Sequence, residues 1–137
     1  MEIQISGQYG DPLSSKIFSP LRIELNQCFK KNISREYFNT LIKLAIVLRV
    51  SGEISDFKSQ GAERLRYWKK DKVLSIDLVF FESQWLGVDL SVVRKIMAEG
   101  IKECLNLMIE RAVKLNEVVD KEALMEGIEN ALADFLE

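Results

Sequence analysis

The 137-residue chain contains no histidine. Histidine is the commonest general base and the commonest metal ligand, so its absence removes Ser-His and Cys-His nucleophile pairs and most zinc sites. The only cysteines, Cys28 and Cys104, lie far apart in apolar stretches and form no C-x-x-C pair. We therefore expect reduced core thiols rather than a disulfide or a metal site.

The sequence also lacks long apolar runs and glycine-rich loops. No stretch approaches the roughly 20 apolar residues of a membrane span, and the N-terminal MEIQISGQYG has neither the basic nor the apolar segment of a signal peptide. None of the seven glycines belongs to a dinucleotide- or phosphate-binding loop. We expect a cytoplasmic protein with no membrane segment and no cofactor.

The composition is that of one ordinary globular domain. Hydrophobic residues make up 47% of the chain and charged residues 29%, so residues 1–137 are expected to form a single domain with its own core. The net charge of −2 argues against non-specific binding to nucleic acid.

Alternation of apolar and polar residues predicts the strands. The pattern occurs in residues 2–9, 21–29, 42–56, 63–69 and 73–82. Within these, Ser19-Pro20 suits the start of a strand, Gly52 suits a bulge, and the Lys69–Lys72 stretch KKDK suits a tight turn.

The periodicity then changes to that of helices. A stripe at 3.6-residue spacing runs from Val93 to Leu115 behind a capping Asp89, and Asp120 can cap a last helix over 121–136. Strands followed by helices predict an α+β fold, a mostly antiparallel four- to five-stranded sheet with two C-terminal helices packed on one face.

The predicted hairpin RLRYWKKDKVLSIDLVFFESQW is locally basic. Residues 58–72 hold six lysines and arginines against two acidic residues. Alternation places Leu65 and Tyr67 inward and the set Arg64, Arg66 and Trp68 outward. A solvated sheet edge explains the lysines, whereas exposed Trp and Arg are also typical of protein interfaces and of single-stranded nucleic-acid sites.

The C-terminal segment is acidic instead. Residues 101–137 hold four basic and nine acidic residues. Solvation explains this, and the functional alternative is a surface that steers a basic partner, such as a nuclease toxin, into contact. The candidate carboxylates are those of Glu122, Glu126, Glu129 and Asp134.

Asp77 lies in the middle of a predicted strand, between two apolar residues, Ile76 and Leu78. An exposed strand carboxylate, or a partner for Arg64 or Arg66 across the hairpin, explains it. An enzyme that uses Asp77 with a lysine would need this residue to lie in a concave pocket.

In its architecture the chain resembles the bacterial immunity proteins of polymorphic toxin and contact-dependent growth inhibition systems. The resemblance lies in the early EIQISGQ strand, the hairpin above and the DLSVVRKIMAEGIKECL helix. It implies a non-enzymatic protein that binds and occludes one cognate toxin in the cytoplasm. The alternatives are a nucleic-acid-associated module that uses the basic 64–72 hairpin, and a homodimer through an exposed sheet edge.

Overall fold

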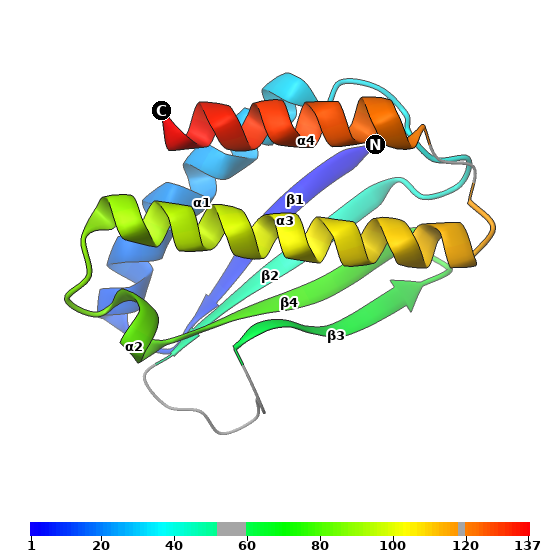
Figure 1. Cartoon of the computed structure of the whole chain (residues 1–137). Helices are drawn as coiled ribbons and strands as arrows, with labels where there is room; N and C mark the ends of the chain where they lie inside the picture. The colour runs from blue at the N-terminus through cyan, green and yellow to red at the C-terminus, as the bar shows by residue number, and fades with distance from the viewer. Residues whose placement is uncertain (52–59, 118–119) are drawn as a thin grey trace.

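The computed structural model describes residues 1–51, 60–117 and 120–137 of the chain. These residues form a four-stranded sheet and four helices (Figure 1). The elements in chain order are β1 (Glu2–Tyr9), α1 (Pro12–Asn32), β2 (Lys43–Ser51), β3 (Gly61–Trp68), β4 (Val73–Phe81), α2 (Glu82–Trp85), α3 (Leu90–Lys114) and α4 (Lys121–Leu136).

The α+β class is confirmed, and of the expected four to five strands the described residues form four. The sheet is mixed, so the expectation of a mostly antiparallel sheet is wrong. Its order is β1-β2-β4-β3, in which β1, β2 and β4 run parallel and only β3 pairs antiparallel with β4. A parallel neighbour requires a crossover connection, usually a helix. The helix α1 provides that connection between β1 and β2.

The predicted strand over 21–29 is in fact part of α1. Asp11 caps this helix by accepting a hydrogen bond from the Ser14 N–H at 2.7 Å, and Pro12 occupies the first turn, where its missing N–H costs nothing. The buried residues of α1 recur at helical spacing: Ser14, Phe18, Leu21, Leu25 and Phe29. Pro20, expected at a strand start, lies inside the helix.

The other predicted elements are confirmed with small changes of boundary. Residues 2–9 form β1, the stretch 43–51 of the predicted 42–56 strand forms β2, and the hairpin strands are β3 and β4. Gly52 and the rest of 52–56 lie outside the described residues. The turn between β3 and β4 closes with a hydrogen bond from the Lys72 N–H to the Lys69 carbonyl.

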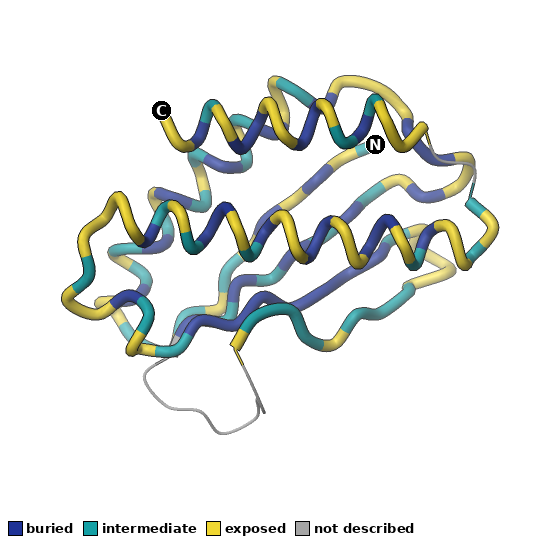
Figure 2. The backbone as a smooth tube through the Cα atoms, in the orientation of Figure 1, coloured by how far each residue is buried: buried dark blue, intermediate teal, exposed yellow. Residues whose placement is uncertain are grey.

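Of the predicted C-terminal helices, α3 packs on one face of the sheet, and α4 packs against α3 and α1 on the same side (Figure 1). The core lies between these helices and the sheet, where Leu44, Ile46, Leu48, Ile76 and Leu78 are almost inaccessible to solvent. Figure 2 shows the buried residues on the inner sides of α3 and α4.

The opposite side of the sheet, called here the helix-free face, carries the alternate side chains. None of the described helices packs on it (Figure 1). From β2 and β4 it presents the odd-numbered residues, and the strand register adds Arg66 and Trp68 of β3, which stand beside Ser75 and Val73.

Candidate partner-binding surfaces

The helix α4 presents an acidic stripe to solvent. Its buried side includes Leu124, Ile128 and Phe135, so the residues of the opposite side, Glu122, Glu126 and Glu129, are exposed. Glu129 pairs with Lys102 of α3 at 3.5 Å. Among the described residues none forms an ion pair with Glu122 or Glu126. These two carboxylates therefore keep their charge available to a partner.

Other carboxylates of the acidic C-terminal segment have structural roles. Asp134 is half-buried and accepts a hydrogen bond from Asn32 Nδ2 of α1 at 3.0 Å, so it lies apart from the stripe. Asp120 accepts the Ala123 N–H at the start of α4 and pairs with Arg35. Glu117 accepts the Leu41 N–H at 2.6 Å. Three of the four predicted acidic residues thus form one surface, and Asp134 does not belong to it.

Asp134 also acts on a neighbouring thiol. Partial burial raises the pKa of Cys28, and the carboxylates of Asp134 and Glu24 raise it further. Both cysteines are free, with Cys28 half-buried and Cys104 buried.

The hairpin places its predicted residues as alternation indicates, except at a bulge. Leu65 and Tyr67 are partly buried against the core, whereas Trp68 is 48% exposed. The register shifts between Glu63 and Arg66, and Arg64 within this bulge has a φ of 58°. Arg66 and Trp68 therefore share the helix-free face. Arg64 lies in the bulge, outside the regular pairing of β3 with β4.

Asp77 lies at the centre of the helix-free face and is only 1% exposed. Its Oδ2 atom is 3.5 Å from Arg66 Nη2 and 3.6 Å from Arg49 Nε. Its Oδ1 atom has no hydrogen-bond partner among the described residues. The expected contact with Arg66 across the hairpin is confirmed. Arg49 was missed, because only the parallel pairing of β2 with β4 brings it beside Asp77.

This arrangement provides an electrostatic contact between the strands. Both described ionic partners of Asp77 are arginines, which stay protonated and hold the carboxylate in place. Among the described residues, no group of three His, Cys, Asp or Glu side chains is placed to hold a metal ion.

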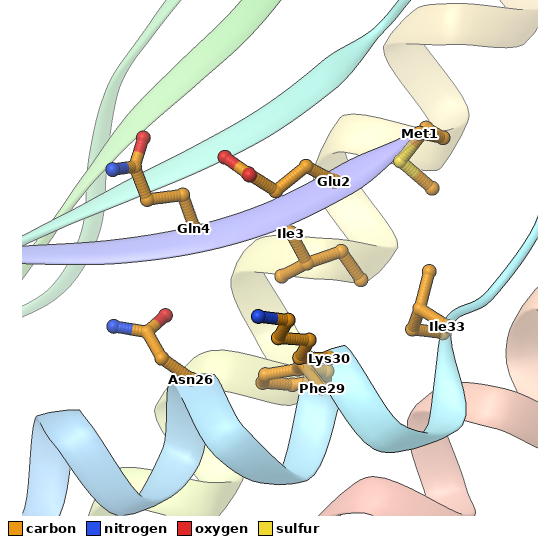
Figure 3. A pocket seen from close by; sticks show the side chains of 8 residues that line it. All are labelled: Met1, Glu2, Ile3, Gln4, Asn26, Phe29, Lys30 and Ile33. Atoms are coloured by element: carbon orange, nitrogen blue, oxygen red, sulfur yellow. The ribbon is translucent and has the colours of Figure 1, made fainter.

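A separate pocket between β1 and α1 was also missed by sequence reasoning (Figure 3). It has a volume of about 370 Å³ and is lined from one side by the start of β1 and from the other by the second half of α1. The amide of Asn26 joins the two elements, since its Oδ1 accepts the Ile5 N–H and its Nδ2 donates to the Ile5 carbonyl, both at 2.8 Å. The pocket depends on α1, which the sequence pattern did not reveal.

Comparison with protein families gives a match to nearly the whole chain. The family model described as Immunity protein 44 matches residues 1–134. No curated protein and no solved structure matches the chain. Within the described part of the chain, none of the helices has the length and apolar character to cross a membrane.

Proposed function

Because the chain belongs to the Immunity protein 44 family, we propose that it neutralises one cognate toxin by binding it directly in the cytoplasm. The observation that carries this proposal is the family match, which covers nearly the whole chain. The toxin would be occluded without any chemical step, because the charged groups found at the surface hold and steer partners rather than activate a substrate.

The acidic stripe is the proposed contact surface for a basic toxin. Glu122 and Glu126 are exposed and Glu129 extends them by one turn. Carboxylates at such a position accelerate the encounter with a basic protein and disfavour nucleic acid, whose phosphates they repel. A toxin that acts on nucleic acid carries the complementary charge.

The hairpin side of the helix-free face is the second candidate, and the exposure of Trp68 beside Arg66 favours it. Tryptophan and arginine are enriched among the residues that dominate binding energy. The two candidate surfaces lie on opposite sides of the sheet, so single substitutions distinguish them.

The test is co-expression with the toxin encoded beside this chain, followed by measurement of growth and of association kinetics. Growth should be rescued by the native chain. Glu126→Lys should slow association roughly tenfold, and the matched control Glu82→Lys on α2 should leave it unchanged within about twofold.

Three outcomes decide between the proposals. Loss of binding in Trp68→Ala but not in Glu126→Lys would move the contact to the hairpin. Failure to bind or protect against the adjacent toxin would overturn neutralisation. Salt-sensitive binding of single-stranded RNA that Arg66→Ala weakens would favour the nucleic-acid alternative instead.

A further inference from the structure

The pocket between β1 and α1 exposes the backbone edge of β1. The Glu2 N–H donates to the Ile42 carbonyl and so points toward β2. Successive residues of a strand point their backbone groups to opposite sides, and the Ile5 N–H indeed points away from β2, to Asn26. Ile3 must then direct its N–H and carbonyl away from β2 as well, toward the pocket that it lines.

Asn26 takes the place of a neighbouring strand at one position only. Its side-chain amide gives Ile5 the donor and acceptor that a paired strand would supply. None of the described side chains does this for Ile3. An extended segment laid along β1 would therefore pair with Ile3 and stop at Asn26, which already occupies the next pairing position. A chain end fits this geometry better than a continuous strand.

The residues that line the rest of the pocket indicate which end of a polypeptide, amino or carboxyl, it would accept. Ile3, Phe29 and Ile33 are nearly buried and form an apolar floor. Figure 3 shows Lys30 rising from α1 toward β1, while Glu2 and Gln4 point away from α1.

Among the described residues that line the pocket, ion pairing leaves one cation without a salt bridge. Glu2 pairs with Lys43 at 3.6 Å, and the Met1 ammonium pairs with Glu36 at 2.6 Å. No described residue forms a salt bridge with Lys30. The ammonium of Lys30 is therefore the charge that an incoming carboxylate would meet, one helical turn from Asn26.

We infer that this pocket binds the C-terminal end of an extended polypeptide. The segment would run parallel to β1, pair its backbone with Ile3, place an apolar side chain on the floor and set its terminal carboxylate against Lys30. The volume is near the lower limit of ligand pockets, roughly 300 to 1,000 Å³, so the bound segment is short. Strand addition of this kind takes affinity from main-chain hydrogen bonds and specificity from side-chain pockets.

The inference rests on the proposed function only for the identity of the partner, which would be the toxin. The test uses the isolated, full chain with ¹⁵N labels and an acetylated Ala-Val-Ile peptide bearing a free C-terminal carboxylate. At millimolar peptide, nuclear magnetic resonance should show shifts of the Ile3, Asn26 and Lys30 amide signals. The C-terminal amide of the same peptide, and an amidated peptide with an internal aspartate, should each bind roughly tenfold more weakly.

Two variants provide matched controls on one helix. Lys30→Glu should abolish the shifts, whereas Lys16→Glu, the same charge change on an exposed part of α1, should preserve them. Equal affinity for acid and amide, shifts confined to other surfaces, or unchanged binding in Lys30→Glu would each overturn the inference. A chain that neutralises its toxin but binds no peptide would refute this site and leave the proposed function standing.

Discussion

Asp77 is the residue whose environment differs most from that of an ordinary strand carboxylate. It is 1% exposed, although it belongs to the face of the sheet that no described helix covers. Arg49 and Arg66 lie against it from the two neighbouring strands. Because the arginines are partly solvated, removal of the carboxylate would leave two like charges close together without the group that holds them.

Asp77→Ala should therefore lower the free energy of unfolding by about 2 kcal/mol, from lost charge-assisted contacts. Urea denaturation followed by circular dichroism measures the change. The control Asp71→Ala, in the exposed hairpin turn, should shift stability by less than about 0.5 kcal/mol. Equal urea midpoints for Asp77→Ala and Asp71→Ala would show that the contacts of Asp77 with the two arginines do not contribute to stability.

The cluster of Asp77 with Arg49 and Arg66 could be predicted only in part from the sequence. Alternation along the hairpin was sufficient to place Arg66 and Asp77 on one face. Arg49 comes from a strand that is adjacent only through parallel pairing. A pattern of period two says which way a side chain points, but it does not say which strand is its neighbour.

At the scale of elements, α1 shows why a short alternating run can mislead. Leu21, Ile23 and Leu25 alternate with polar residues and so satisfy the strand pattern. In the helix, Leu21 and Leu25 are buried, but Ile23 is 49% exposed. The distinguishing signal was Phe18 and Phe29, which extend the three- and four-residue spacing beyond the run. Once this helix was missed, the parallel order of the sheet and the pocket beside β1 were missed with it.

The contact between α1 and α4 depends on the absence of a side chain at Gly127. A Cβ atom there would lie 2.7 Å from Ile33 Cδ1 and 3.0 Å from the backbone oxygen of Asn32. Alanine gains about 1 kcal/mol in helix propensity over glycine, but a backbone atom cannot easily move aside. Gly127→Ala should therefore be destabilising by about 1 to 3 kcal/mol in thermal or urea unfolding.

Gly100→Ala in α3 is the comparison for this prediction. There the nearest atoms are the terminal carbons of Leu78, at 2.9 and 3.0 Å, which belong to a side chain that can rotate. Gly100→Ala should therefore lower the free energy of unfolding by less than Gly127→Ala does. The reverse order would mean that the packing of α3 on the sheet, rather than α4 on α1, is the tighter contact.

At the scale of the whole molecule, stability should fall at alkaline pH. Burial raises the pKa of Cys104 from 9.0 to about 12, and the carboxylates of Glu103 and Asp77 add to the shift. Between these values the unfolded chain loses the thiol proton while the folded chain keeps it. The free energy of unfolding therefore decreases as pH rises above about 9, by at most about 1.4 kcal/mol per pH unit.

Cys104→Ala should be less stable than the native chain at neutral pH, because it leaves a small cavity. Its stability should nevertheless decline less between pH 9 and 11, as measured by urea midpoints. Cys28→Ala should change the pH dependence of stability less than Cys104→Ala does, since Cys28 is only half-buried. Parallel pH profiles for the native chain and Cys104→Ala would contradict the role of this thiol.

The pairing of α4 with α1 also determines when the protein can fold during its synthesis. The contacts that close this pair, Gly127 with Ile33 and Asp134 with Asn32, join the first helix to the last. A nascent chain exposes the inner side of α1 until the C-terminal segment has left the ribosome. A message truncated before α4 would thus yield a chain with an uncovered apolar surface, which is a substrate for chaperones and proteases rather than a partly protective product.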